Sequence, residues 1–311
     1  MTLFSGENAM NKSLLYTLLI SAAFFAGSQA NAEEDWPPHL AGVFEGSAAG
    51  ALPPQGVYFV NETLLTGTKL YNNAGDPSST GIKSNIAVDV PIVLWVPGIK
   101  LLGADYALGA AQPFDYVSTS APGPHSGGTN LGARAGIFNT LLIPAQLSWA
   151  LPNDLHVKAS LGVYLPDGDF EAANKMAIPN GMGFWSLEPS IGVSWLHDGW
   201  NVSGSFAYDH NFKNGKTNYQ SGDGIDGDYT LTKTLGKWTV GVGGYTEFQL
   251  ANDSLDGVTR ANSKLEKIGA GPIAGYNFGP VIVQANYNFQ LHTTNMVQGD
   301  EFWLNVTVPL K

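Results

Sequence analysis

The sequence predicts an all-β protein, specifically a transmembrane antiparallel β-barrel of about 12 strands with short periplasmic turns and long external loops. Three observations predict this class: the composition, the two-residue period of hydrophobicity, and the alternation of connection lengths. The chain of 311 residues has 38 Gly, 35 aromatic residues (8 Trp, 12 Tyr, 15 Phe) and only 13% charged residues. That charged fraction is about half the value of an ordinary soluble domain, and uncharged polar residues take its place.

The composition also excludes several classes of function. The chain has no Cys, which excludes disulfide scaffolds, cysteine nucleophiles and thiolate metal sites. Its formal net charge is −11, and so few cations cannot build the basic face that a nucleic-acid partner requires. We therefore expect no nucleic-acid partner.

The first residues read as a secretory signal peptide. Met10-Asn11-Lys12 supplies a positive start, an apolar run covers residues 14–26, and Ala30-Asn31-Ala32 fits a small-residue cleavage site. The sequence thus predicts a signal peptide over 1–32, with Met10 as a plausible start of translation. Residues 33–55 show no hydrophobic period, and two alternatives stay open for them: a plug inside a barrel, or a periplasmic extension.

From residue 56 to the end at 311, the dominant period is two, as expected of strands with two different faces. In the clearest segment, 281–292, apolar side chains alternate with Gln, Asn and His. Most of the segments reach the ~9–11 residues that a tilted strand needs to cross a bilayer. The predicted strands cover 56–65, 82–96, 102–112, 131–149, 154–165, 182–196, 199–209, 227–234, 238–250, 265–278, 281–292 and 301–310.

The connections between these strands alternate strictly in length. Tight turns rich in Gly, Pro, Asn and Asp are expected at 97–99, 152–153, 197–199, 236–237 and 279–280, and long polar loops lie between the other pairs. Such sorting is typical of bacterial outer-membrane barrels. We expect the apolar strand faces to meet lipid, with Trp149, Trp195, Trp200 and Trp238 near the interfaces. The loop 113–130 is predicted to fold over the lumen.

Four stretches of the sequence are distinctive: Leu52 to Tyr58 (LPPQGVY), Asn139 to Trp149 followed by LPDG at 165–168, Trp185 with Glu188-Pro189, and Asn218 to Asp223 followed by GVGGYTEFQL at 241–250. In these stretches the chain resembles the outer-membrane channel family associated with the meta-pathway of phenol degradation. The resemblance covers most of the chain after residue 32. It implies a channel of twelve strands that admits small, often hydrophobic or aromatic molecules.

Polar and charged residues on the expected inner faces are the candidate lumen-lining residues. A hydrated lumen needs such side chains, which either orient solutes or pair to brace the wall. The candidates are Lys83, Asp89, Asp105, Arg134, His156, Lys158, Glu188, Asp209, Glu247, Gln249, Lys267, Gln284, Asn286, Asn288 and His292.

No cofactor and no catalytic residue is predicted. A weak candidate for calcium is the acidic stretch with Asp223, Asp226 and Asp228, expected in an external loop, but a solvated acidic loop is commoner than a site with six to eight oxygen ligands. The pattern at 269–274 (GAGPIA) lacks the helix that a dinucleotide site needs, because Pro272 interrupts it.

The sequence therefore predicts a passive channel, not an enzyme, in the outer membrane of a Gram-negative bacterium. Its expected partners are outer-membrane lipid and a small-molecule solute, without an energy-coupling partner. Two alternatives stay open: an outer-membrane lipid or ester hydrolase, and a soluble exported β-sandwich that binds a ligand.

Overall fold

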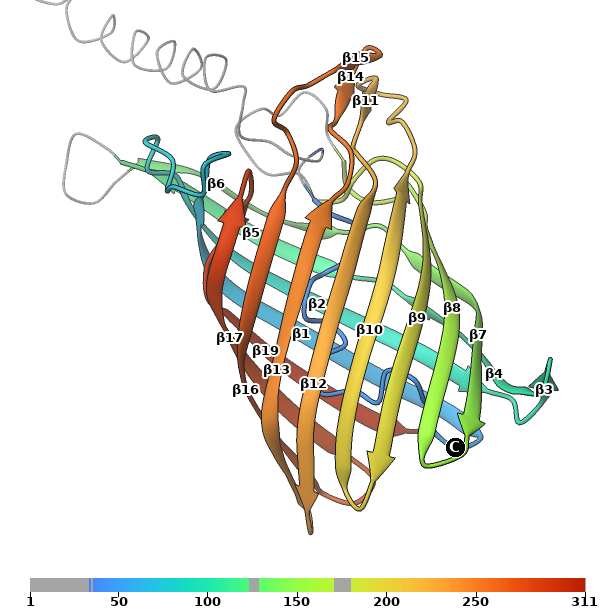
Figure 1. The fold of residues 1–311 in the computed structure, drawn as a ribbon. Coiled ribbons are helices and arrows are strands. Elements are labelled where there is room, and N and C mark those ends of the chain that lie inside the picture. Colours follow the sequence, from blue (N-terminus) through green and yellow to red (C-terminus); the bar gives the residue numbers. More distant parts are fainter. Residues whose placement is uncertain (1–33, 35, 123–128, 171–179, 311) are drawn as a thin grey trace, which may run out of the picture.

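The computed structural model describes residues 34, 36–122, 129–170 and 180–310, and these residues form an antiparallel β-barrel (Figure 1). The wall strands are β1 (Gly56–Leu70), β2 (Lys83–Val96), β4 (Ala104–Ala111), β5 (Phe114–Ala121), β6 (Thr129–Ile137), β7 (Leu141–Leu151), β8 (Leu155–Tyr164), β9 (Ser186–His197), β10 (Trp200–Asn211), β12 (Gly224–Leu235), β13 (Trp238–Gln249), β16 (Glu266–Asn277), β17 (Ile282–Thr294) and β19 (Glu301–Pro309). Short pieces are β3 (Lys100–Leu101), β11 (Tyr219–Gln220), β14 (Ser254–Leu255), β15 (Val258–Thr259) and β18 (Val297–Gln298).

The sheet closes on itself at the first strand. β1 pairs with β2 on one side and with β19 on the other, so that Thr63 lies opposite both Asp89 and Leu304. Because β4 continues into β5 along β2, and β6 into β7, the described residues cross the wall twelve times. Closure at β1 pairs the first and last wall strands, as a β-structure in lipid requires.

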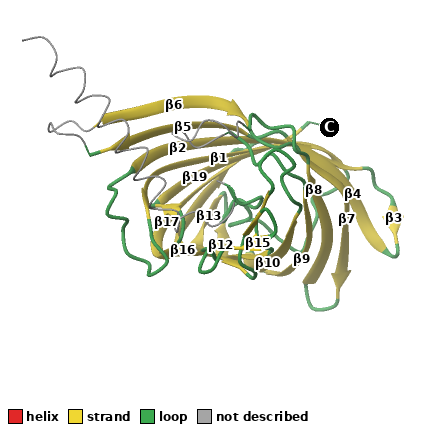
Figure 2. Ribbon diagram, turned by 90° about the horizontal axis from the view of Figure 1, so that it is seen from above, coloured by secondary structure: helices red, strands yellow, loops and turns green. Residues whose placement is uncertain are grey.

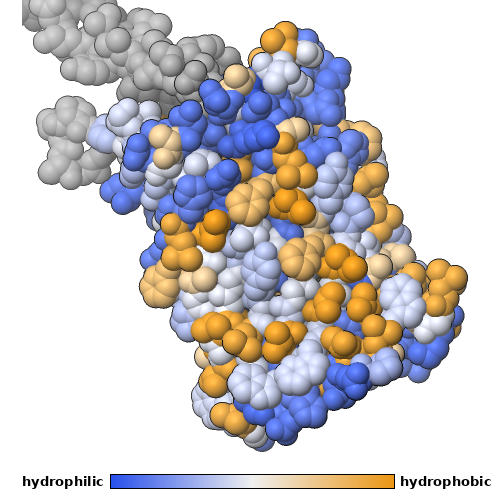
Figure 3. Space-filling view, viewed as in Figure 1, coloured by the Kyte–Doolittle hydropathy of each residue, from blue (hydrophilic) through white to orange (hydrophobic). Residues whose placement is uncertain are grey.

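The outer surface of the barrel is largely apolar and the inner surface largely polar. On β13, Val240 and Val242 are 44% and 53% exposed, whereas Tyr245 and Glu247 on the other face are buried. Figure 3 shows hydrophobic side chains over the lower part of one face, beneath a hydrophilic upper end. This polarity is the reverse of that in a soluble barrel, and it confirms the predicted transmembrane class. The described part of the chain contains no apolar helix of membrane-spanning length.

Tight turns gather at one end of the barrel, together with the described end of the last strand (Figure 1). Asn153 and Asp154, and Asp198 and Gly199, have positive φ angles, as two-residue hairpin turns require. The first turn lies elsewhere than expected. It is formed by Leu102 and Gly103 rather than 97–99, because the chain continues as β3 and folds back onto β4.

The stretch 113–130, predicted to be a loop over the lumen, is part of the wall, and that prediction is wrong for the described residues. Residues 114–121 form β5 and residue 129 begins β6, so this stretch is a hairpin in the wall. Its own alternation places Asp115 and Val117 inside and Phe114 and Tyr116 outside. Viewed from above, β5 and β6 extend away from β7 and β8 (Figure 2). Among the described strands, β8 pairs with β7 and β9 but not with β6.

Candidate functional site: the occupied barrel lumen

Residues 36–55 run inside the barrel, between opposite walls (Figure 1, blue). The segment forms successive turns with few internal hydrogen bonds, such as Val43 N–H to Leu40 O at 3.1 Å. Gly42 and Gly46 have φ angles of +88° and +79°, a conformation that favours glycine. The turns leave many backbone groups free to form hydrogen bonds with the wall. Because the segment is bonded to the wall in this way, we treat the lumen and the segment together as the candidate site.

An acidic part of the wall holds the middle of the segment. Asp228 on β12 accepts hydrogen bonds from the backbone N–H of Gly42 at 2.8 Å and of Phe44 at 3.0 Å. The His39 ring lies between two carboxylates, with Nδ1 3.2 Å from Glu188 on β9 and Nε2 3.4 Å from Asp228. All three side chains are buried. Burial lowers the pKa of His39, whereas the carboxylates of Glu188, Asp226 and Asp228 raise it. The effect of the carboxylates is the larger one, so the pKa of His39 lies well above its usual value.

The segment has further anchors on other strands. On β17, Asn288 donates to the Glu45 carboxylate at 2.9 Å and Gln284 donates to the Glu45 backbone carbonyl at 2.9 Å. Burial, followed by the nearby Asp228 carboxylate, raises the pKa of Glu45 to about 9. At the far end, Gly50 N–H donates to Ser194 at 2.7 Å.

Glycine permits the closest approach between the segment and the wall. A β-carbon at Gly192 on β9 would lie 2.1 Å from the Ala49 carbonyl oxygen. A β-carbon at Gly50 would lie 2.3 Å from the His156 carbonyl oxygen. Because both contacts are with backbone atoms, neither could be relieved by a side-chain rotation. The segment is therefore fitted to the wall at this end.

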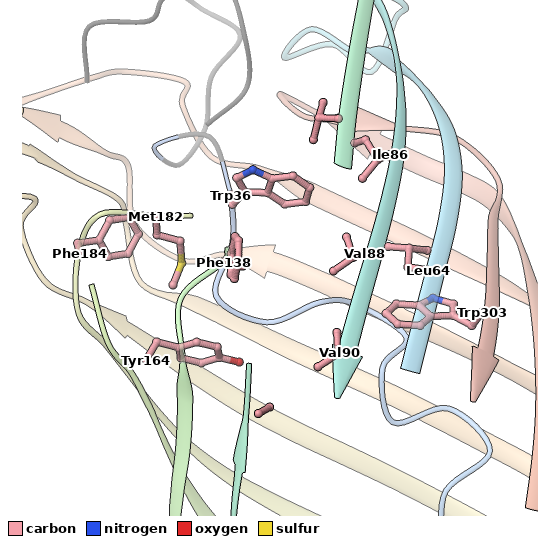
Figure 4. Packing of buried hydrophobic residues seen from close by; sticks show 12 residues of the cluster. Trp36, Leu64, Ile86, Val88, Val90, Phe138, Tyr164, Met182, Phe184 and Trp303 are labelled. Atoms are coloured by element: carbon pink, nitrogen blue, oxygen red, sulfur yellow. The ribbon is translucent and has the colours of Figure 1, made fainter. Parts of the chain in front are cut away.

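The opposite part of the lumen is apolar. Trp36 packs edge-on against Phe138, with ring centroids 5.7 Å apart. Figure 4 shows Trp36 between Phe138 on one side and Ile86 and Val88 of β2 on the other. The cluster also contains Leu64, Val90, Ala111, Val117, Tyr164, Met182, Phe184 and Trp303. The lumen thus has an apolar wall facing an acidic one, and the segment 36–55 lies between them.

A row of charged side chains continues the acidic wall across neighbouring strands. Asp226 on β12 lies directly opposite Glu247 on β13, and Glu247 lies opposite Lys267 on β16. Lys267 forms an ion pair with Glu301 at 2.8 Å. Asp209 on β10 adds a further buried carboxylate beside Asp226. Of these four carboxylates, Asp226, Glu247 and Glu301 lie near Lys267.

The structure places most of the predicted lumen residues inside the barrel. Buried residues of this set are Glu188, Asp209, Glu247, Gln249, Lys267, Asn286 and Asn288; half-buried residues on the inner face are Arg134, His156, Lys158 and Gln284.

Three of the predicted lumen residues lie elsewhere, and these predictions are wrong, while a fourth, Asp105, lies opposite the inward-facing Ser148 at the turn end of the barrel. Lys83 and Asp89 are on the outer face of β2, because its apolar residues turn inward onto Trp36. Asp105 pairs with Lys100 at 2.7 Å on the exposed β3–β4 hairpin. His292 pairs with Glu266 at 3.0 Å on the exposed surface.

The acidic stretch considered for calcium does not form one cluster. Asp226 and Asp228 belong to strand β12 and point into the lumen, rather than lying in an external loop. Asp223 instead accepts a hydrogen bond from the hydroxyl of Tyr208 at 2.5 Å and contacts the His210 ring. Within the described ranges, no group of three or more His, Asp or Glu side chains is arranged to hold a metal ion.

The sequence analysis did not identify the residues that dock the N-terminal segment. His39, Glu45 and Asp228 form its main polar contacts, and Glu62 is a further buried carboxylate on β1. A signal was present: Gly42, Gly46 and Gly50 recur every four residues in a stretch without hydrophobic period. Each of them contacts the wall closely.

Comparison with known proteins places the chain among bacterial membrane barrels. Residues 67–306 match the family described as "Putative MetA-pathway of phenol degradation". The COG4313 outer membrane channel from Pseudomonas putida F1 aligns with a TM-score of 0.68 and 15% identity, over 84% of this chain and 97% of that one. The translocator domain of the autotransporter NalP from Neisseria meningitidis gives a TM-score of 0.47 at 11% identity, over 96% and 98%. No curated protein matches the chain.

Proposed function

Because the chain belongs to the MetA-pathway phenol-degradation family, and folds as a barrel with an apolar outer surface, we propose that it is an outer-membrane channel for passive uptake of small hydrophobic or aromatic molecules. The observation that carries the proposal is the lumen, which is closed by a short docked segment and has one apolar and one polar wall. Such a lumen contacts both the ring and the polar groups of a small solute.

Passage through the lumen requires the N-terminal segment to move. The segment is held by separate hydrogen bonds, each of which contributes about 1 kcal/mol net to docking, with more for the charged ones. The wall, by contrast, is a continuous ladder in which β1 and β2 alone pair over fourteen positions. Displacing the segment is therefore much easier than separating two strands.

The proposed channel function also requires that the protein is exported and reaches the outer membrane. We propose that residues 1–32 direct export and are removed, and that the barrel assembles in the outer membrane of a Gram-negative bacterium with lipid around it. An insert of about 20 residues is far smaller than the plug domain of energised transporters, which supports diffusion without an energy-coupling partner.

A hydrolase is less well supported. Within the described residues, His39, His197, His210 and His292 each lie within hydrogen-bond distance of a carboxylate, and none of these four is bonded to a serine or threonine hydroxyl. A serine nucleophile needs a general base at that distance. The geometry of these histidines therefore favours a channel over an enzyme.

Flux into liposomes tests the proposal. The full chain, and a variant lacking residues 36–50, would be reconstituted and their uptake of dihydroxybenzenes compared with that of sugars of similar size. Heat-modifiable migration on a gel verifies that each barrel is folded. We expect dihydroxybenzenes to enter faster than into empty liposomes, and flux to rise in the shortened variant. Rates equal to those of empty liposomes for both folded proteins would overturn the channel.

A further inference from the structure

The inner surface of the barrel carries a large excess of buried carboxylates over cations. Eight carboxylate side chains of the wall strands are less than 9% exposed: Glu62, Asp115, Glu188, Asp209, Asp226, Asp228, Glu247 and Glu301. The buried basic side chains of the described residues are His39 and Lys267, and Arg134, His156 and Lys158 are half-buried on the inner face. An acidic lining of this kind repels anions and attracts cations and hydrogen-bond donors.

Almost all buried side-chain atoms that lack a hydrogen-bond partner are acceptors. Of the fourteen buried side-chain atoms without a partner in the described part, thirteen are oxygens, and the remaining one is the indole nitrogen of Trp303. Glu247 is the strongest case, because it is 4% exposed and neither of its carboxylate oxygens has a partner. Its cross-strand neighbour Asp226 is also buried and lies beside the Asp209 carboxyl group. Buried acceptors without partners are costly, and a ligand with donors relieves that cost.

The docked segment indicates which ligand chemistry fits this lumen. It presents donors to the carboxylates of the wall, namely the backbone N–H groups of Gly42 and Phe44 and the ring of His39, while the Gly46 N–H donates to the Thr230 hydroxyl. On its other side the Trp36 ring packs against the apolar wall. A solute that takes its place must offer the same combination, an aromatic or apolar body with hydrogen-bond donors.

We propose that the lumen selects aromatic solutes that carry hydrogen-bond donors, namely phenols, aromatic alcohols and aromatic amines, and discriminates against aromatic carboxylates. The proposal rests on the proposed channel function and specifies its substrate class. A phenol hydroxyl donates to a free carboxylate oxygen while its ring lies on the apolar wall. An aromatic carboxylate carries a negative charge where the other solutes carry a hydrogen-bond donor. The carboxylates of the wall therefore repel it, and their free oxygens stay without a partner.

The test compares two solutes of nearly equal size, para-hydroxybenzyl alcohol and para-hydroxybenzoate, at neutral pH in proteoliposomes. Rates are corrected for empty liposomes and measured for the full chain and for the variant lacking residues 36–50. We expect the carboxylate to enter at least about tenfold more slowly than the alcohol. Equal entry of the two solutes overturns the selectivity alone. Entry of neither solute, in either folded protein, overturns the channel function itself.

Two charge-removing variants identify the residues responsible. Glu247→Gln keeps the shape of the side chain but removes one buried carboxyl group, and we expect it to raise carboxylate entry relative to alcohol entry several-fold. Asp256→Asn removes one charge from an exposed external turn, where its φ angle of 52° suits asparagine, and serves as the matched control. An unchanged ratio in folded Glu247→Gln, or an equal rise in both variants, overturns the assignment to the lumen wall.

Discussion

At the scale of single residues, exposure separates the two faces of a strand. Val242 lies on the outer face of β13 and is 53% exposed, while Gln284 on β17 points inward and bonds to the Glu45 carbonyl. For Val242 the surrounding medium is hydrocarbon, and for Gln284 it is a polar lumen. The same substitution should therefore have different energetic costs at the two positions.

We expect Val242→Arg to lower the free energy of unfolding by about 2–4 kcal/mol, since it places a charge near the middle of a lipid-facing strand. Gln284→Arg loses two hydrogen bonds, to the Glu45 carbonyl and to the Asn286 side chain, at about 1 kcal/mol each, but places its charge near Glu45 and away from lipid. Equilibrium unfolding of the two variants in lipid vesicles measures both values. Similar losses at both positions would contradict the assignment of the outer face.

At the scale of elements, the two-residue period predicted most of the wall strands to within a few residues. It missed β5, where Pro113 and nearby glycines indicated a loop although Phe114 to Val117 alternate in burial. It also gave β2 the wrong inner face. Periodicity shows that a strand has two faces, but not which neighbours each face meets, and Ile86 and Val88 meet Trp36 from a distant part of the chain.

The lumen residues could be predicted only where the strand that carries them has a clear hydrophobic period. Candidates on strands with one clearly apolar face, such as Glu188, Glu247 and Asn288, lie buried on the inner face. His39 and Glu45 were not found, because the segment that carries them has no period of its own and is ordered only by the walls around it. Their role depends on long-range contacts, which local sequence patterns do not encode.

The fit between β9 and the N-terminal segment leads to a prediction for Gly192→Val. The added β-carbon would lie 2.1 Å from the Ala49 carbonyl oxygen, so the segment must shift while the strand itself keeps its pairing. We expect a higher single-channel conductance in planar bilayers, with normal heat-modifiable migration.

Gly204→Val on the adjacent strand β10 is the matched control. A β-carbon there meets the Phe206 side chain at 3.3 Å and no part of the segment 36–55. If both folded variants conduct like the wild-type protein, close packing at Gly192 does not hold the segment in place. An equal increase in both variants would also argue against it.

At the scale of the whole molecule, the two surfaces of the barrel are suited to two different environments. Its outer surface is suited to lipid, and its inner surface divides into an apolar wall and an acidic wall that the N-terminal segment bridges. Because the segment crosses from one wall to the other, its position depends on hydrophobic contacts at Trp36 and on electrostatics at His39 and Glu45. Protonation therefore connects solution conditions to the state of the channel.

We expect conductance to rise with pH. Both titrating groups of the segment have pKa values raised by docking: that of His39 lies well above its usual 6.5, and that of Glu45 is about 9 against a usual 4.5. The docked state thus binds more protons than the released state, so docking is most favourable at low pH and weakens as pH rises. For Glu45 this loss accumulates between the usual value of 4.5 and about 9, and for His39 it begins above 6.5.

Planar-bilayer recordings from about pH 6 to about pH 9 measure this change in conductance. His39→Gln should be more open at the acidic end and respond less to pH, whereas His197→Gln, at an exposed turn, should behave like the wild-type protein. A conductance that falls with pH, or stays constant in the folded wild-type protein, would show that the segment is not released in this way.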